Sequence, residues 1–341
     1  MEELLRVKDL RVSFHTYAGE VRAVRGVSFS LRKGEVLATV GESGCGKTVT
    51  SKAVMRLLDR TSGKIDPASV VELEGKNLVT MPKRELNRLR GKEISMIFQD
   101  SMTSLNPTMT VGKQIMENIL THEMVGRQEA RRRAEELLEL VEIPDPRGRL
   151  DNYPHQMSGG MRQRAMIAIA LACGPKILIA DEPTTALDVT IQAQLLDLLR
   201  NIQKKTEMSI ILVTHDLGIV ASFADRIQVM YAGMIVERGS VQDIFKVPKH
   251  PYTWALLSSV PSRALESKEE LYALQGTPPD LRRPLEGCSF AERCEYCMDI
   301  CRRHCPEEFP IDQGHTAACW LCHPMAPAVA PPAGIGGSEH G

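Results

Sequence analysis

The stretch GESGCGKT (Gly41–Thr48) constrains this chain more than any other feature, because it fits the pattern G-x-x-x-x-G-K-[ST] completely. It follows the apolar run EVLATV (Glu35–Val40), which predicts a buried strand, and it precedes a helical pattern. A strand, a glycine-rich loop and a helix in this order predict a phosphate-binding loop. We expect Lys47 to reach the β- and γ-phosphate oxygens and the Thr48 hydroxyl to ligate Mg²⁺. The other predicted loop contacts are Gly41, Glu42, Ser43, Gly44, Cys45 and Gly46.

Strand-like and helical patterns alternate from the first residues to about residue 250, which predicts an α/β fold. The runs KILIAD (Lys176–Asp181) and SIILVTHD (Ser209–Asp216) are two further buried strands that end on polar residues. Carboxyl ends of parallel strands form the ligand crevice of such sheets. We therefore expect Asp181 to face the metal's water shell and Glu182 to polarise the attacking water.

Two further polar residues follow predicted strands. His215 could contact the γ-phosphate or orient Glu182, and its place in the predicted crevice favours this over a structural histidine. Gln99 follows the strand-like run Ile94–Phe98, and a neutral amide there could contact Mg²⁺ and the water. We therefore predict catalytic roles for Glu182, His215 and Gln99.

A second candidate phosphate site lies at Ser158-Gly159-Gly160, where a helix begins with bare backbone N–H groups. The alternative is that Ser158 is an ordinary N-cap and the glycines permit helix packing. Taken alone, the stretch favours this alternative, and it is a poor independent nucleotide site because it contains no lysine and no strand precedes it. It would make sense as half of a site, closing on a nucleotide held by the phosphate loop of another subunit.

Charge and hydropathy exclude several function classes. Lys and Arg total 42 against 43 Asp and Glu, so no basic field indicates nucleic-acid binding. No apolar run approaches the ~20 residues that a membrane-spanning helix needs, and the charged first residues do not resemble a secretory signal. Between Ser101 and Met157 the pattern is helical, with an amphipathic helix predicted over Glu129–Glu142.

The phosphate loop, Gln99, MSGGM (Met157–Met161), LIADEPTTALD and THD together resemble the nucleotide-binding subunits of ABC transporters in order and spacing. Four segments, which begin at Ile94, Tyr153, Ile179 and His250, resemble the oligopeptide/dipeptide importer branch, and nickel importers share much of them. The resemblance implies an α/β P-loop NTPase (RecA-like) core, a helical ABC signature subdomain and a small Cys-rich C-terminal domain. It also implies two ATP molecules sandwiched head-to-tail, each between one subunit's phosphate loop and the other's signature loop.

The resemblance also places the domains and partners. Residues 1–100 and 159–250 would form the ATP-binding core, 101–158 the helical subdomain, 251–325 the C-terminal domain, and 326–341 a disordered tail. The partners would be two transmembrane permease subunits, a second ATPase subunit and, through the complex, an extracytoplasmic substrate-binding protein. The chain would work at the cytoplasmic face of the membrane. Phe14, or alternatively Tyr17, would stack on adenine.

A different class is a soluble ABC ATPase acting on nucleic acid. Such chains usually carry two cassettes or a long coiled-coil insert, whereas this one has a single cassette and a short helical insert. We therefore expect no nucleic-acid partner and a peptide importer, with a nickel or other small-solute importer as the alternative within the family.

Seven of the nine cysteines lie between Cys288 and Cys322, which favours a metal site over disulfides. Two CxxC pairs, Cys294/Cys297 and Cys319/Cys322, resemble a zinc ribbon, and the run from Cys294 to Cys305 resembles a ferredoxin motif. The peptide-importer resemblance instead implies a structural [4Fe-4S] cluster, whose spacing is matched by Cys288, Cys294, Cys301 and Cys319. Because this segment follows the predicted core, we expect cluster loss to affect the C-terminal segment more than nucleotide binding.

Overall fold

The computed structural model describes residues 2–59, 61–99, 104–184, 188–259, 274–332 and 335. Contacts within the chain define two compact units. Unit 1 comprises residues 1–4, 31–35 and 80–213, and unit 2 comprises residues 5–30, 36–79 and 214–341.

The core of unit 1 is a set of parallel strands in the order β9-β8-β7. They are β7 (Ile94–Ile97), β8 (Ile177–Asp181) and β9 (Ser209–Thr214). Every residue of the three strands is buried, as expected for apolar runs covered on both faces. The strands predicted from KILIAD and SIILVTHD are confirmed.

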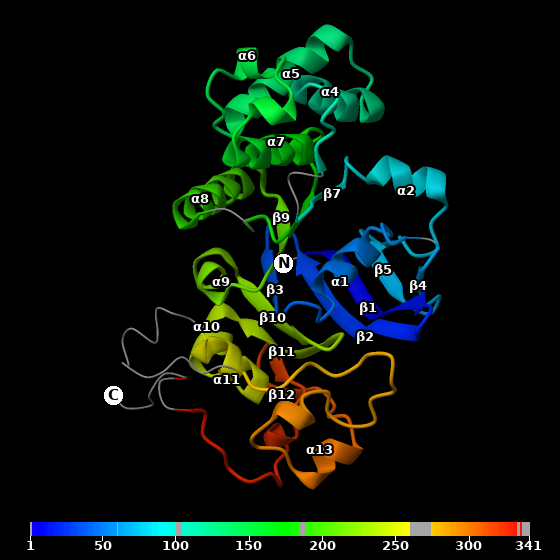
Figure 1. Cartoon of the computed structure of the whole chain (residues 1–341), viewed down its shortest axis with the longest axis vertical. Coiled ribbons are helices and arrows are strands. Elements are labelled where there is room, and N and C mark those ends of the chain that lie inside the picture. The colour runs from blue at the N-terminus through cyan, green and yellow to red at the C-terminus, as the bar shows by residue number, and fades with distance from the viewer. Residues whose placement is uncertain are drawn as a thin grey trace. The chain divides into compact units, whose positions relative to one another are not determined.

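Helices make up the rest of unit 1, and Figure 1 shows α4 to α7 gathered into one group. The helical elements are α2 (Lys83–Leu89), α4 (Val111–His122), α5 (Arg127–Leu140), α6 (Pro146–Arg149), η1 (Pro154–Gln156), α7 (Gly159–Leu171) and α8 (Val189–Thr206). The predicted amphipathic helix is α5, which buries Ala130, Ala134 and Leu138 along one face. The helical pattern between residues 101 and 157 is thus confirmed for its described part.

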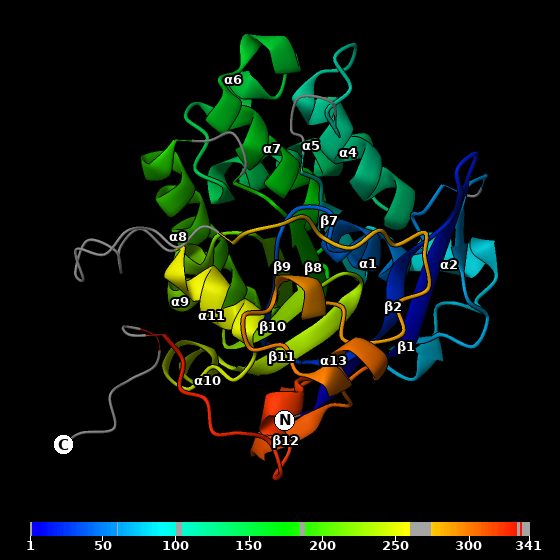
Figure 2. The ribbon, with the colours of Figure 1, turned by 60° about the horizontal axis from the view of Figure 1, so that its bottom comes forward.

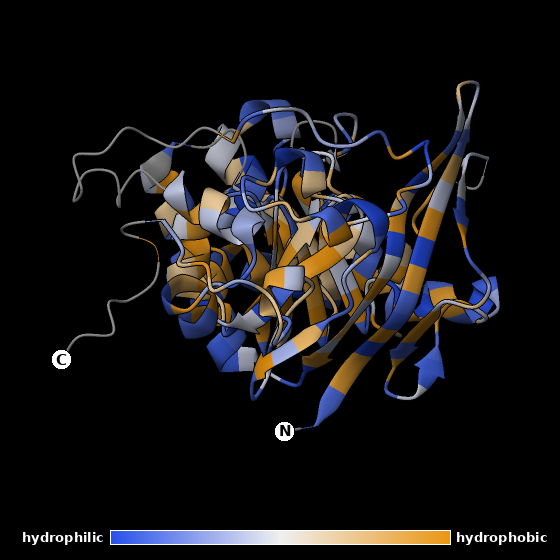
Figure 3. Cartoon of the chain, turned by 90° about the horizontal axis from the view of Figure 1, so that it is seen from below, coloured by the Kyte–Doolittle hydropathy of each residue, from blue (hydrophilic) through white to orange (hydrophobic). Residues whose placement is uncertain are grey.

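Unit 2 contains an antiparallel sheet in the order β2-β1-β5-β6, with β4 paired to β1. Its strands are β1 (Glu3–Thr16), β2 (Gly19–Arg32), β4 (Gly63–Ile65), β5 (Val70–Leu73) and β6 (Lys76–Asn77). Apolar and polar residues alternate along the long strands β1 and β2 (Figure 3). This alternation gives the sheet one buried and one exposed face.

Unit 2 also contains strands in the order β12-β13-β11-β10-β3. They are β3 (Val36–Val40), β10 (Arg226–Tyr231), β11 (Met234–Ser240), β12 (Phe309–Asp312) and β13 (His315–Ala317). The predicted strand before the phosphate loop is β3, and the hairpin predicted at Ala232-Gly233 joins β10 to β11. Both are confirmed. Figure 2 shows the C-terminal strands next to β11, with which β13 pairs.

The helices of unit 2 are α1 (Lys47–Val54), α9 (Leu217–Phe223), α10 (Val241–Lys246), α11 (Pro251–Ser258), η2 (Ala291–Arg293), α13 (Asp299–Arg303) and η3 (Trp320–Cys322). Within the described residues, no helix is long and apolar enough to cross a membrane. Of the predicted disordered tail, residues 326–332 form no helix or strand, and residues 333–334 and 336–341 lie outside the described chain. The predicted domain ranges stay predictions.

A buried histidine fixes the start of α11. His250 is 1% exposed, and its Nδ1 accepts a hydrogen bond from the Tyr252 backbone N at 3.0 Å. Its own backbone N donates to the buried Glu237 carboxylate at 3.0 Å. Burial lowers the pKa of His250 to about 4, against the opposing charge of Glu237. His250 therefore stays neutral near pH 7, which keeps Nδ1 available as the helix cap.

This burial predicts a loss of stability in mild acid. Below its ordinary pKa the unfolded His250 binds a proton, whereas the folded one stays neutral until about pH 4. From about pH 7.5 to about pH 5.5, this group should lower the free energy of unfolding by about 1 kcal/mol. Urea titrations at both pH values should show this difference, and His250→Asn, which keeps a capping oxygen, should reduce it. The exposed His304→Asn is the matched control. An unchanged pH dependence in His250→Asn would contradict the assignment.

Candidate active site

The phosphate loop connects β3 to α1 and packs closely against neighbouring backbone. A Cβ on Gly41 would lie 2.2 Å from the Met230 carbonyl oxygen, and one on Gly46 would lie 2.6 Å from that of Ala23. Gly46 also has a backbone φ of +106°, which residues other than glycine rarely adopt. Glycine is therefore required by contact at both ends of the loop, and at Gly46 by conformation as well.

Lys47 folds back over this loop. Its side chain is buried, and Nζ donates to the carbonyl oxygens of Gly41 at 2.7 Å and Glu42 at 2.9 Å. The ammonium group thus lies over the loop, where the motif requires it to meet phosphate oxygens. Thr48 is the second residue of α1. Cys45 is buried, and burial raises the pKa of its thiol, which makes it a poor nucleophile.

Glu42, the first variable position of the loop, is held by two residues from distant parts of unit 2. Its backbone N donates to the Tyr252 hydroxyl at 2.8 Å. Its carboxylate accepts two hydrogen bonds from Arg293, at 2.6 and 3.0 Å. Neither partner was among the predicted site residues. Tyr252 lies within a segment that carried the family resemblance, whereas no local sequence signal marks Arg293.

In unit 1, the structure brings Gln99 and Glu182 together. Gln99 Nε2 donates to Glu182 Oε2 at 2.7 Å, and Glu182 directly follows the buried Asp181 at the end of β8. Glu182 has φ +46°, a conformation that costs roughly 1–3 kcal/mol in a non-glycine residue. Its backbone N donates to the Val213 carbonyl oxygen at 2.9 Å, which holds this strained position.

The start of α7 supports both interpretations of Ser158. Its hydroxyl accepts a hydrogen bond from the Met161 backbone N at 3.3 Å, so it is an N-cap. Among the described residues, a Cβ on Gly159 would meet nothing within 4 Å, and one on Gly160 would meet only Ile191 at 3.4 Å. Packing against the described residues therefore does not require glycine at residue 159. Close approach of a ligand or of a second chain would explain why residue 159 is glycine.

Three other predicted residues lie at strand ends. His215 is exposed immediately after β9, and Asp216 caps α9 through the backbone N of Gly218. Phe14 lies in β1 opposite Gly63 and is half-buried, whereas Tyr17 is fully exposed in the following turn. The adenine-stacking role of Phe14, with Tyr17 as the alternative, stays a prediction.

The cysteine-rich segment, Cys288–Cys322, contains free thiols and no disulfide. The thiols of Cys288 and Cys294 are half-buried and are held neutral, since burial raises the pKa of Cys288 to about 12 and that of Cys294 to about 11. Within the described residues, which include all nine cysteines, no group of three or more His, Cys, Asp or Glu side chains is placed to hold a metal ion. Cys288 interacts electrostatically with Cys294, Cys301, Cys305 and Cys319, and Cys319 also forms a hydrogen bond with Cys322.

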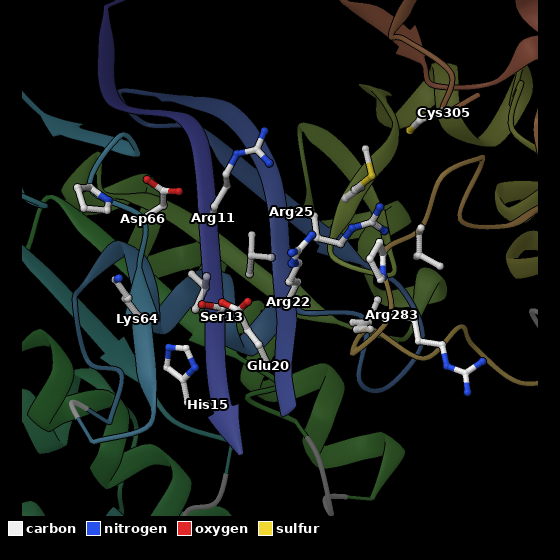
Figure 4. A pocket seen from close by; sticks show the side chains of 17 residues that line it. Arg11, Ser13, His15, Glu20, Arg22, Arg25, Lys64, Asp66, Arg283 and Cys305 are labelled. Atoms are coloured by element: carbon white, nitrogen blue, oxygen red, sulfur yellow. The ribbon is translucent and has the colours of Figure 1, made fainter. Parts of the chain in front are cut away.

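Unit 2 also contains a cavity of about 590 Å³, and Cys305 of the cysteine-rich segment is one of its lining residues (Figure 4). Its charged lining comes from Arg11, Glu20, Arg22, Arg25, Lys64, Asp66 and Arg283, and it includes no residue of the phosphate loop. Arg25 donates to the Ala232 carbonyl oxygen at 3.2 Å and to Ser289 Oγ at 2.9 Å. This guanidinium therefore joins β2 to the cysteine-rich segment. The loop chemistry, rather than cavity size, locates the candidate active site.

A phosphate loop after a buried strand and an Asp-Glu pair at the end of a second strand define a P-loop ATPase. Residues 24–185 match the family model of ABC transporters, and residues 236–301 match that of the oligopeptide/dipeptide transporter C-terminal region. Two solved cassettes show the same fold. The ABC transporter cassette MJ0796 is 25% identical with a TM-score of 0.62, covering 70% of this chain and 99% of that chain. The cbiO1 subunit from Clostridium perfringens is 26% identical with a TM-score of 0.60, covering 72% and 91%.

Two relatives from Bacillus subtilis (strain 168) match nearly the whole chain. The oligopeptide transport ATP-binding protein OppD is 56% identical, covering 97% of this chain and 92% of the relative. The dipeptide transport ATP-binding protein DppD is 54% identical, covering 94% and 95%. The chain belongs to this family of oligopeptide and dipeptide transport ATP-binding proteins. The predicted α/β P-loop fold, family and ATPase activity are confirmed; the Cys-rich C-terminal domain stays a prediction.

Proposed function

We propose that this chain hydrolyses ATP to drive the uptake of di- and oligopeptides through a membrane transporter. The phosphate loop with the buried Lys47 over it carries the ATPase part of the proposal. The identity to peptide transport proteins across nearly the whole chain supports the peptide part. A nickel importer is the alternative within the family. The family matches disfavour the soluble class that acts on nucleic acid.

We infer the following roles in nucleotide binding and hydrolysis. Lys47 and the loop N–H groups bind the β- and γ-phosphates, while Thr48 and Gln99 hold Mg²⁺ and Asp181 holds its water shell. Glu182 accepts a proton from the attacking water, and His215 contacts the γ-phosphate or orients Glu182. The Gln99–Glu182 hydrogen bond supports this assignment, because it places an amide against the proposed base.

The signature loop Ser158-Gly159-Gly160 would complete the site of a second ATPase subunit, either a copy of this chain or a paralogue. The open space at Gly159 supports this, since a bare backbone can approach a phosphate closely. Two permease subunits and an extracytoplasmic binding protein would complete the transporter. The chain would then lie on the cytoplasmic face of the membrane.

The cysteine-rich segment would hold a metal group through Cys288, Cys294, Cys301 and Cys319. The match of their spacing to the peptide-importer pattern supports this set. We favour a [4Fe-4S] cluster over zinc because the spacing of these four cysteines matches the pattern that the peptide-importer resemblance implies. Bound there, the cluster would cross-link the segment, and binding would release the protons of the buried thiols.

Replacing the proposed base tests the hydrolytic assignment. Glu182→Gln should bind MgATP but lose roughly 10²–10⁴-fold in turnover, because an amide cannot accept the proton. ATP should then trap a closed dimer, which size-exclusion chromatography can detect. Glu207→Gln is a matched control, because Glu207 is also a glutamate with positive φ but is exposed. Near-normal ATPase activity of Glu182→Gln in the assembled transporter would refute the assignment.

Splitting two lesions between subunits tests whether the signature loop acts in trans. A forced dimer of one Lys47→Ala subunit and one Ser158→Arg subunit should place both lesions in one composite site and leave the other intact. Trapped nucleotide should then fall by half relative to the wild-type dimer. Self-contained subunits would instead lose both sites. If the natural partner is a paralogue, the two lesions are divided between the two different chains.

Anaerobic purification tests the metal group. The full chain should be brown and contain about four irons per chain if the [4Fe-4S] assignment holds. Serine at Cys288, Cys294, Cys301 or Cys319 should bleach it, whereas serine at Cys297, Cys305 or Cys322 should not. Colourless protein with stoichiometric zinc that depends on Cys297 and Cys322 would favour the zinc ribbon.

A further inference from the structure

One charged side chain of the cysteine-rich segment reaches the phosphate loop. The Arg293 side chain is 5% exposed, and all three of its guanidinium nitrogens are engaged. Two of them bind the Glu42 carboxylate, Nε donates to the Gln275 carbonyl oxygen at 2.9 Å, and Nη1 also donates to the Tyr231 hydroxyl at 3.3 Å. The Glu42 contact raises the pKa of Arg293, so the guanidinium stays charged.

The backbone that presents Arg293 is a compact turn between two cysteines. Ala291 N donates to the Cys288 carbonyl oxygen at 3.0 Å, and Cys294 N donates to that of Ala291 at 3.4 Å. Phe290 anchors this turn, because its ring centroid lies 5.2 Å from that of Tyr231 and 5.4 Å from that of Tyr252. The direction of Arg293 therefore depends on the fold of the turn from Cys288 to Cys294.

The charge of Glu42 explains why this contact matters for an anionic ligand. A carboxylate in a phosphate-binding loop repels phosphate oxygens unless a cation neutralises it. Arg293 supplies that cation with a two-pronged geometry that also fixes where the carboxylate lies. Tyr252 holds the backbone of the same residue from a second side.

We propose that Arg293 is a positioning residue of the nucleotide site, which neutralises and orients Glu42 and thereby links nucleotide affinity to the fold of the cysteine-rich segment. The proposal rests on nucleotide binding by the phosphate loop. It depends neither on which metal the cysteines hold nor on which solute is transported.

The test measures MgADP affinity of the full chain by calorimetry, together with its urea unfolding midpoint. Arg293→Gln should weaken MgADP binding by roughly ten-fold, because the Glu42 charge is then uncompensated. Arg293→Lys, which keeps the charge but loses the fork, should weaken it less. Arg282→Gln is the matched control, since Arg282 forms a two-pronged pair with Asp280 on the exposed surface.

A double substitution separates this role from a merely structural one. Adding Glu42→Gln to Arg293→Gln removes the uncompensated charge, so the double variant should bind MgADP more tightly than Arg293→Gln alone. A purely structural role predicts a lower unfolding midpoint with unchanged affinity, or a double variant weaker than either single one. Either result would overturn the proposal.

Lys47→Ala distinguishes a failure of this inference from a failure of the proposed function. If Lys47→Ala leaves MgADP affinity unchanged, the phosphate loop is not the nucleotide site, and both ideas fail. If Lys47→Ala abolishes binding while Arg293→Gln matches wild type, only the role of Arg293 is refuted.

Discussion

The close packing of the phosphate loop against neighbouring backbone is the constraint on which the rest of the site depends. Gly41 and Gly46 let the loop approach the carbonyl oxygens of Met230 and Ala23 to distances that no side chain allows. Cys45 adds a backbone hydrogen bond from Gly233 at 2.8 Å. The loop is thus shaped by β2 and the β10–β11 hairpin before any ligand arrives. Because the loop is already shaped, the main change on binding would be at Lys47. Its Nζ would exchange the carbonyl oxygens of Gly41 and Glu42 for phosphate oxygens.

In unit 1 the surrounding backbone likewise holds a site residue in place, here Glu182, whose own backbone is strained. The backbone of Glu182 is in the left-handed conformation, which costs free energy. The hydrogen bond from its N–H group to the Val213 carbonyl oxygen and the packing around β8 offset this cost. Gln163 of α7 donates to the Pro183 carbonyl oxygen at 2.6 Å, which ties the helix after the signature loop to the residue after Glu182. A shift of α7 would therefore be felt at the proposed base. The backbone strain at Glu182 is consistent with a need to hold its carboxylate, the proposed base, in one fixed direction.

Sequence reasoning succeeded where residue type determines backbone geometry locally. The phosphate loop, the buried strands before it and before Asp181, and the hairpin at Ala232-Gly233 all follow from short patterns. It failed where function depends on contacts between distant parts of the chain. Arg293 lies 251 positions from Glu42, and an arginine in a cysteine-rich segment has no local pattern that indicates its partner. The buried His250 was likewise visible only as part of a family segment, because its neutral state comes from burial.

The contacts at Glu42 also change how the C-terminal region is understood. From its position in the sequence, we expected metal loss there to affect the C-terminal segment more than nucleotide binding. That expectation assumed that the segment follows the nucleotide site without touching it. Tyr252 and Arg293 both contact Glu42, so the segment supplies part of the loop's immediate surroundings. The two-pronged geometry of this ion pair, rather than its net stability, fixes where the carboxylate lies. Its value here lies in fixing the charge and direction of one loop residue.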